Sequence, residues 1–186
     1  CVPAGEGNHG RVLTETQISP GGEDARKDSE SRFRFAYEDG TRFLPFGTTC
    51  YAWIYQPERV QEQTLDTLKD SGFNKVRMCI FPKFYTYNME DPRLAPFEGN
   101  AAEGFDFTRF CTAFWNNLEL RINQLDEMGI QADLILFHPY DKWGFSRMDP
   151  ETDAFYLKYA VDRLCHFKNV WWSLANEYDL MPWKTE

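Results

Sequence analysis

The sequence predicts an α/β protein in which four strand–helix units form the N-terminal half of a (β/α)8 TIM barrel, preceded by a β-hairpin. After residue 46, apolar strand-like runs alternate with helix-like segments, which is typical of right-handed β-α-β units and a parallel sheet. Polar residues collect at the carboxyl end of each run, where barrel enzymes keep their sites. No Gly-rich phosphate loop follows the first run, which disfavours an open dinucleotide-binding sheet.

Residues 1–32 differ in character from the rest and are interpreted as a linker or tail from a preceding domain. Residues 20–30 have almost no apolar side chain to bury, so we expect this stretch to be partly disordered. Only the short run 11–14 has the character of a strand. Because the chain starts at Cys1 and not at Met, we expect it to be a processed or excised segment. The half-barrel is expected over residues 33–186.

The elements expected within the half-barrel follow from alternation, helical spacing and turn residues. In chain order they are hairpin strands over 33–37 and 42–46, a strand over 47–53, a helix starting at Pro57, a strand over 74–81, a loop over 82–104, a helix over 107–128, a strand over 131–137, a helix over 152–167 and a strand over 169–175. The Asp39-Gly40 pair is a strong hairpin signal. Gly72 and Gly129 mark the ends of the first two helices. The long loop is rich in Tyr, Phe and Pro, and loops of this length are more often functional than decorative.

The composition excludes several classes of function. A net charge of −9 without a basic run disfavours a nucleic-acid surface. No apolar run approaches the length of a membrane span, and no signal peptide opens the chain. The five cysteines form no C-x-x-C pair, and most lie within predicted strands or helices, where they are interpreted as small buried hydrophobes of a reducing, cytoplasmic compartment, unless a longer parent chain carries a signal peptide. The three histidines are too dispersed for a metal site, and we expect no cofactor.

An aromatic content of 17% exceeds the needs of a plain core and suits a ring-binding cleft such as a sugar site. Trp53, Tyr140 and Trp143 lie near strand ends and are candidate ring platforms, although packing in loops or in the core is an equally good reading for the two tryptophans. The predicted ligand is therefore a carbohydrate, with no nucleic acid and no membrane as partner.

Four polar residues stand on successive strands or at their ends. Arg77 lies within an apolar strand, where a guanidinium needs a carboxylate partner. His138 ends the third strand, and Asn176-Glu177 ends the fourth. Alternation along 169–175 places Glu177 on the same face as Trp171, Ser173 and Ala175, pointing into a cleft. The structural readings remain open: an ion pair for Arg77, a satisfied strand-end imidazole for His138 and a solvated loop residue for Glu177.

This ordered set resembles the retaining glycoside hydrolases of clan A, such as the cellulase-like family 5 enzymes. In that clan an Arg on the second strand, a His ending the third and an Asn-Glu pair ending the fourth recur. The lead-in over residues 34–49 resembles that of bacterial relatives with a β-sandwich ahead of the barrel. The resemblance covers about residues 33–186.

The resemblance implies a role for each residue. Glu177 would be the general acid/base, Asn176 would bind the sugar 2-hydroxyl, and Arg77 would orient the nucleophile. His138 would contribute to the substrate site. Protonation of the leaving group works best from a partly apolar setting, which Trp171 and Trp172 are expected to supply. The family's nucleophile is a Glu ending the seventh strand, and the chain has only four, so we expect a fragment that is inactive on its own.

Three alternatives remain open. The first is a non-catalytic carbohydrate-binding barrel module, which has the aromatic cleft without the chemistry. The second is a barrel enzyme that uses Lys75 or Lys83 for carbonyl or phosphate chemistry. The third is a structural half-barrel that pairs with another chain. In every case the open edges of the sheet need the remaining half of the barrel, or a second copy, to cover them.

Overall fold

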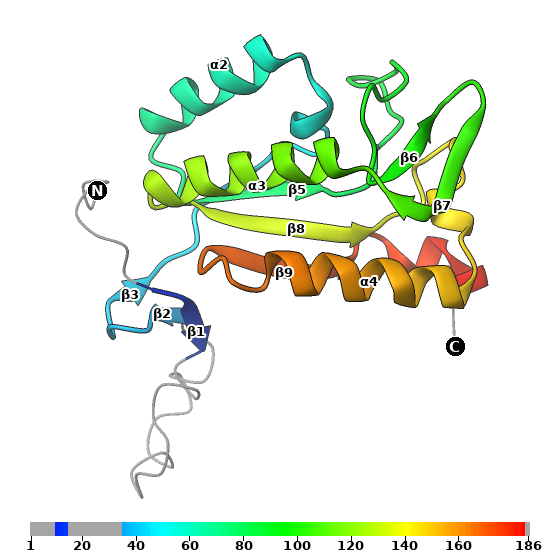
Figure 1. Ribbon diagram of the computed structural model, residues 1–186. Coiled ribbons are helices and arrows are strands. Elements are labelled where there is room, and N and C mark those ends of the chain that lie inside the picture. The colour runs from blue at the N-terminus through cyan, green and yellow to red at the C-terminus, as the bar shows by residue number, and fades with distance from the viewer. Residues whose placement is uncertain (1–9, 15–34, 185–186) are drawn as a thin grey trace, which may run out of the picture.

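The centre of the molecule is a parallel four-stranded sheet, as the sequence predicts. The computed structural model describes residues 10–14 and 35–184. The sheet order is β4-β5-β8-β9, and every neighbouring pair is parallel (Figure 1). Its strands are β4 (Gly47–Thr49), β5 (Lys75–Cys79), β8 (Gln131–Phe137) and β9 (Val170–Ala175). Strands β5 and β8 lie in the middle of the sheet and are mostly buried, whereas β4 and β9 form its edges.

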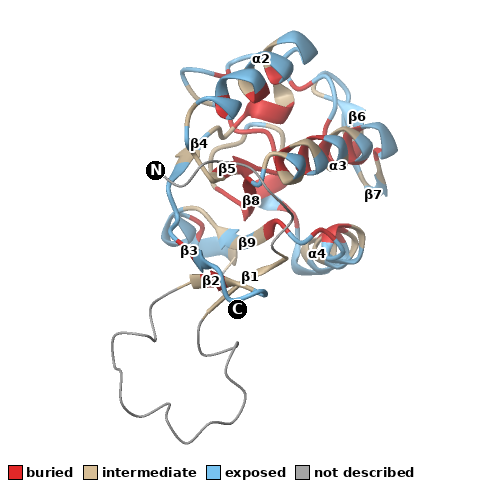
Figure 2. Cartoon of the chain, turned by 90° about the vertical axis from the view of Figure 1, so that its left-hand side faces the viewer, coloured by how far each residue is buried: buried red, intermediate tan, exposed pale blue. Residues whose placement is uncertain are grey.

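The long helices lie along the outer face of this sheet. They are α2 (Glu58–Lys69), α3 (Thr112–Glu127) and α4 (Pro150–Leu164), and they form an arc around the strands (Figure 2). Alternation directs Met78 and Leu134 toward the helices, which contribute Leu118 and Tyr156 to the same core. All four side chains are fully buried. Predicted helix ends at Gly72 and Gly129 are confirmed, because both glycines adopt positive φ just beyond α2 and α3.

The inner face of the sheet is polar, as in the lining of a barrel. The strand register places Arg77 opposite Asp133, and Asp133 opposite Trp171. The Lys75 ammonium lies 2.7 Å from the Asp133 carboxylate. The Ser173 hydroxyl donates a 2.6 Å hydrogen bond to the same carboxylate. An ion pair and a hydrogen bond therefore connect β5, β8 and β9 across the inner face.

A small antiparallel sheet lies at the amino ends of the barrel strands (Figure 1). It consists of β1 (Val12–Thr14), β2 (Phe35–Tyr37) and β3 (Arg42–Phe43), so the predicted hairpin and the strand near 11–14 are confirmed. The rings of Phe35 and Phe43 contact Trp171 with centroids 5.2 and 5.7 Å apart. This sheet therefore covers the amino end of the inner face. The disorder expected over 20–30 falls outside the described residues.

The largest differences from the predicted elements lie at β4 and before α3. Strand β4 ends at Thr49 instead of residue 53, and the chain enters a short 3-10 helix (Trp53–Tyr55). Residues 107–110, expected in a helix, belong to the hairpin of β6 (Phe97–Asn100) and β7 (Gly104–Phe110). The hairpin is favoured over the predicted helix because two alternate residues of β7, Phe105 and Phe107, pack their rings against Phe145 at centroid distances of 5.0 and 5.7 Å. Within the described part of the chain, no helix has the length and apolarity to cross a membrane.

Candidate active site

Glu177 lies directly beyond the carboxyl end of β9. The Asn176 amide still donates to the Phe137 carbonyl at 2.9 Å, which extends the β8–β9 ladder by one residue. Glu177 then adopts φ 55° and ψ 52°, and among the described residues it is the only non-glycine residue with positive φ. A left-handed conformation costs a residue with a Cβ roughly 1–2 kcal/mol. Strain of this kind is concentrated at functional sites, where surrounding structure enforces it.

Two side chains contact the Glu177 carboxylate. The Asn176 amide nitrogen donates to Glu177 Oε2 at 3.2 Å. The side chain of Tyr140, from the loop after β8, also interacts with Glu177, and this interaction is the main cause that raises the pKa of Tyr140. Glu177 itself is exposed. The structure thus brings together three of the residues predicted for the site: Glu177, Asn176 and Tyr140.

Lys83 lies next to the Tyr140 ring. It follows β5, is only 8% exposed, and its ammonium lies 3.8 Å from the ring centroid of Tyr51, 4.4 Å from that of Tyr140 and 5.4 Å from that of Tyr85. Among the described residues no carboxylate lies within ion-pair distance of it. Its charge reaches the Cys79 thiol, whose pKa is raised to about 12 by burial, with Lys83 opposing.

His138 is buried and fully hydrogen-bonded to backbone. Its Nδ1 accepts from the Tyr140 amide at 3.1 Å, so Nε2 carries the proton and donates to the Phe81 carbonyl at 3.1 Å. Burial lowers the pKa of His138, which keeps the imidazole neutral. With 2% of its surface exposed, the ring links the loops after β5 and β8 and has no nitrogen left for a sugar. A direct contact of His138 with substrate stays a prediction that this arrangement does not favour.

Arg77 lies on the inner face of β5, between Thr49 and Asp133 in the strand register. Its Nε is buried and has no hydrogen-bond partner among the described residues. The opposite carboxylate of Asp133 is already held by Lys75 and Ser173. A buried donor atom without a partner is costly, so Arg77 Nε can still donate to a further hydrogen-bond acceptor.

The predicted ring platforms separate into two kinds. Trp53 is a correction: it is 3% exposed, belongs to the hydrophobic core and donates its indole N–H to the Gln61 carbonyl at 3.1 Å. The 3-10 turn after β4 directs this ring under α2, away from the strand ends. Trp143 is half-buried at the rim, where it contacts Phe84 and donates to Asp91 at 3.0 Å.

The expected apolar setting from Trp171 and Trp172 is also corrected. Trp171 lies against the small sheet at the amino end of the barrel, far along β9 from Glu177. Trp172 points to the outer face, because alternate residues of a strand face opposite sides. The neighbours of the Glu177 carboxylate are the side chains of Asn176 and Tyr140, and neither tryptophan is among them.

Both carboxylate oxygens of Asp141 are occupied by backbone hydrogen bonds. Its two oxygens accept backbone N–H groups from the turn that follows, at 2.7–3.1 Å: Oδ1 from Trp143, Gly144 and Phe145, and Oδ2 from Ser146. Asp141 therefore shapes the loop that carries Tyr140 and Trp143. In the described chain no group of His, Cys, Asp and Glu could hold a metal ion.

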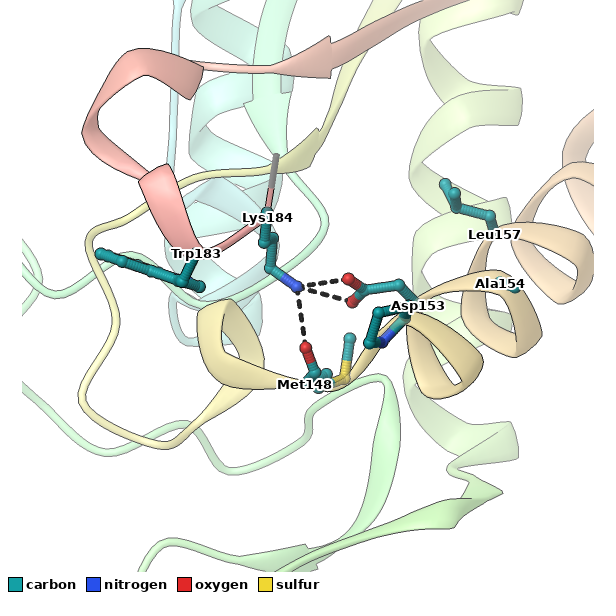
Figure 3. A pocket seen from close by; sticks show the side chains of 7 residues that line it. Met148, Asp153, Ala154, Leu157, Trp183 and Lys184 are labelled. Carbon is teal, nitrogen blue, oxygen red and sulfur yellow. Dashed lines mark hydrogen bonds and ion pairs between the residues drawn. The ribbon is translucent and has the colours of Figure 1, made fainter. Parts of the chain in front are cut away.

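A separate hollow of about 220 Å³ lies beside the start of α4 (Figure 3). Lys184 points across it to the Asp153 carboxylate at 2.7 Å and to the Met148 carbonyl at 3.2 Å (Figure 3). Trp183 closes one side and donates to the Ser146 carbonyl at 2.6 Å. The contacts of Trp183 and Lys184 hold residues 182–184 against the start of α4. Because Lys184 and Asp153 neutralise each other, neither charge is free to bind a ligand.

The family is decided by comparison with known sequences. The model of the apiosidase-like catalytic domain matches residues 29–185. The chain belongs to this family. The prediction of a relationship to glycoside hydrolases is thereby confirmed.

Solved structures agree with the assignment of the apiosidase-like chain. A protein described as a candidate glycoside hydrolase from Bacteroides vulgatus ATCC 8482 is 46% identical, with a TM-score of 0.83 over 99% of this chain. A glycoside hydrolase family 5 structure from the same organism is 14% identical over 91% of this chain, with a TM-score of 0.62. An exo-β-1,4-mannosidase from Opitutaceae bacterium strain TAV5 is 22% identical over 77%, with a TM-score of 0.54. The last two similarities show the fold alone.

The apiosidase-like chain spans only part of these relatives: it covers 35%, 33% and 26% of their chains in the order given. A partial match to barrel enzymes is what a half-barrel produces. Among proteins with curated functions, none matches the chain.

Sequence reasoning did not find Tyr51 and Tyr85 as neighbours of the site. It considered Lys83, but for carbonyl or phosphate chemistry and not together with Glu177. The available signal was that the loops after the first two barrel strands both begin with tyrosine-rich segments. Only the sheet order shows that these loops meet beside the loop after β8.

Proposed function

We propose that this apiosidase-like chain is part of a retaining glycoside hydrolase in which Glu177 is the general acid/base. The observation that carries the proposal is the strained, left-handed Glu177 beyond β9, with its carboxylate contacted by Asn176 and Tyr140. A carboxylate exposed at the carboxyl end of a barrel strand is where barrel enzymes carry out chemistry. Membership of the apiosidase-like family supports the choice of glycosidic bonds as the substrate.

Retaining hydrolysis divides the work between two carboxyl groups about 5 Å apart. In the first step Glu177 gives its proton to the glycosidic oxygen, while a second carboxylate attacks the anomeric carbon and the leaving group departs. In the second step Glu177 takes a proton from water, and the resulting hydroxide displaces the enzyme carboxylate. Asn176 would release Glu177 and bind the sugar 2-hydroxyl.

We propose that the second carboxylate comes from a part of the barrel beyond this chain. Two carboxylates of the described chain do not fit this role, because Asp141 is held by four backbone amides and Asp133 is held by Lys75 and Ser173. The unsatisfied Nε of Arg77 on the inner face would then receive this nucleophile. On this reading the 186 residues alone do not turn over substrate.

The first substrate to test is a glycoside with a terminal apiosyl group, because the family is described as apiosidase-like. β-Mannosides form the comparison set, since one structural neighbour is a β-1,4-mannosidase. Release of the terminal sugar by the full-length protein identifies the substrate class.

The test of Glu177 is Glu177→Ala in the full-length protein. Loss of a general acid/base lowers the rate by typically 10²–10⁴-fold, and the loss should be smaller for substrates with acidic leaving groups. Azide should restore turnover and yield a glycosyl azide, because it needs no general base. Asp179→Ala, at an exposed carboxylate two positions along, serves as the control and should behave as wild type. Unchanged turnover of the Glu177 variant on an ordinary glycoside contradicts the assignment.

The second candidate function is sugar binding without chemistry. The half-exposed rings of Trp143 and Phe84 at the rim favour it, because they offer apolar faces to a sugar. A binding module would retain the same sugar affinity in the wild type and in Glu177→Ala, and neither would hydrolyse any glycoside.

A further inference from the structure

Lys83 is a buried cation that aromatic rings surround. It is 8% exposed, and its ammonium lies 3.8 Å from the ring centroid of Tyr51, 4.4 Å from that of Tyr140 and 5.4 Å from that of Tyr85. The amide of Asn88 donates to the Lys83 carbonyl at 2.9 Å, which fixes the backbone from which the side chain extends. Ring faces stabilise a positive charge, so Lys83 stays buried without a carboxylate partner in the described part of the chain.

The N–H groups of the Lys83 ammonium are unused. An ammonium carries three donors, and no oxygen of the described residues accepts a hydrogen bond from this one. The fully enclosed polar side-chain atoms without a partner are Arg77 Nε and Asn169 Oδ1, again among the described residues. Lys83 Nζ also lacks an acceptor but is not one of these enclosed atoms, so it keeps contact with solvent. The ammonium therefore offers donors to a ligand that takes the place of this solvent.

The position of Lys83 is at the carboxyl ends of the barrel strands. Tyr51, Lys83, Tyr140 and Glu177 come shortly after β4, β5, β8 and β9, and these strands are neighbours in this order. The Tyr140 carbonyl accepts the Phe84 amide at 2.8 Å, so the loops after β5 and β8 are joined next to Lys83. Lys83 thus lies on the edge of the sheet that carries Glu177, where barrel enzymes bind their substrates.

We infer that Lys83 is a sugar-binding residue whose ammonium donates to hydroxyl groups of the sugar that occupies the site beside Glu177. The inference rests on the proposed function and adds a contact that selects a neutral, hydroxyl-rich sugar. Hydroxyl oxygens accept hydrogen bonds, and a charged donor makes stronger bonds than a neutral one. Because the rings of Tyr51 and Tyr140 already hold the ammonium in place, little side-chain entropy is lost when the sugar binds.

A neutral sugar fits this position better than an acidic one. The chain has a net charge of −9, which repels an anionic ligand. Glu177 adds a carboxylate on the same edge of the sheet. The ring faces around Lys83 already compensate its charge, so what the ammonium lacks is hydrogen-bond acceptors and not a counter-charge.

The test uses the full-length protein, a glycoside with a terminal apiosyl group and analogues that each lack one hydroxyl group of that sugar. If the protein hydrolyses β-mannosides instead, the same series is made in mannose. Lys83→Met keeps the side-chain length and removes the donors, which should lower kcat/KM on the complete sugar about 10- to 100-fold. With wild type, one deoxy analogue should show a similar loss. That analogue should cause no further loss with Lys83→Met, because the same hydrogen bond can be removed only once.

Two further variants complete the kinetic test. Lys83→Gln keeps a neutral donor, so its kcat/KM should fall between those of wild type and Lys83→Met, and it carries the test if Lys83→Met does not fold. Lys158→Met is the matched control, because it makes the same substitution at an exposed lysine on α4 and should behave as wild type. Thermal unfolding of each variant shows whether it is folded.

An acidic analogue, with a carboxylate in place of a hydroxymethyl group of the sugar, tests the choice of a neutral ligand. We expect the wild type to use it no better than the neutral glycoside. A preference of tenfold or more for the acidic analogue, lost in Lys83→Met, would overturn the choice of a neutral sugar.

Two kinetic outcomes overturn the contact itself. Wild-type kcat/KM of Lys83→Met on the complete sugar would exclude it. Equal losses of Lys83→Met on the complete sugar and on every deoxy analogue would indicate a structural effect without a hydrogen bond to the sugar.

Calorimetric titration of the free terminal sugar separates this inference from the proposed function, because binding needs no chemistry. If Lys83→Met binds the sugar as wild type does while Glu177→Ala shows azide rescue, only the sugar contact is lost. If Lys83→Met loses affinity for the sugar while Glu177→Ala keeps its turnover, the sugar contact stands and the acid/base role of Glu177 is lost.

Discussion

At the scale of single residues, Lys75 and Arg77 show how two cations on one strand face differ in function. They lie two positions apart on the inner face of β5. Lys75 pairs with Asp133 at 2.7 Å, and the carboxylate partner is 5% exposed. Arg77 has a buried, unsatisfied Nε among the described residues. Lys75 is therefore part of a structural network with Asp133 and Ser173, whereas the Nε of Arg77 can still donate to a further acceptor.

This contrast gives a matched pair of variants in the full-length protein. Lys75→Met leaves Asp133 buried without its cation, and breaking a buried pair in this way costs about 3–5 kcal/mol of unfolding free energy. Arg77→Met removes an unsatisfied donor, so it should cost less than about 1 kcal/mol, yet it should lower kcat by more than tenfold if Arg77 orients the nucleophile. Denaturant unfolding and steady-state kinetics measure both. If Arg77→Met lost stability and kept its activity per folded molecule, Arg77 would be a structural residue.

At the scale of elements, His138 connects the loops that follow β5 and β8. Its two ring nitrogens hold the Phe81 carbonyl and the Tyr140 amide. Burial lowers its pKa from the ordinary value of 6.5, with Asp141 acting in the opposite direction and Lys83 in the same direction. The folded protein therefore binds a proton at this site less readily than the unfolded chain does.

The sign of the pH effect follows from this difference. Above about pH 6.5 the imidazole is neutral in both states and its stabilising contribution is complete. As the pH falls below this value, the unfolded chain takes up the proton first, and the contribution is lost down to the lowered pKa of the folded state. His138→Gln keeps a donor for Phe81 but does not titrate, so the unfolding free energy of the full-length variant should fall less steeply between pH 6.5 and pH 5. An unchanged slope would show that other groups cause the acid sensitivity.

At the scale of the whole molecule, the parallel sheet has two open edges in the described chain, β4 and β9. The outer face of β9 exposes Leu174 at 67% and Trp172 at 39%. In a closed barrel both the strand edges and such apolar side chains are covered by further strand–helix units. A hydrophobic edge strand that stays uncovered tends to associate with another copy.

The 186-residue chain prepared by itself should therefore associate in solution. Leu174→Lys places a charge on the exposed face of β9 and should raise the monomer fraction measured by light scattering. Leu120→Lys is the control, because Leu120 is a 49% exposed residue on helix α3, away from the sheet edge, and should leave association unchanged. A stable, folded monomer of 21.9 kDa for the wild-type chain would contradict the prediction.

The sequence by itself determined the order of the four barrel strands and of the three long helices between them. The Asp39-Gly40 turn, the positive-φ glycines Gly72 and Gly129, and the apolar runs of β8 and β9 are local signals, because each depends on the conformational preference of one or a few residues. Polar tips on successive strands were likewise sufficient to predict a common site at one end of a parallel sheet.

The tertiary structure alone decided where each side chain points and what it meets. Trp53 entered the core because the chain turned after Thr49, and residues 107–110 became a strand because Phe145, far along the sequence, offered a packing surface. Lys83 joined the Glu177 neighbourhood through rings from separate loops. Such placements depend on groups that are distant in the chain. Burial and hydrogen-bond satisfaction are therefore properties of the assembled sheet, and no local pattern specifies them.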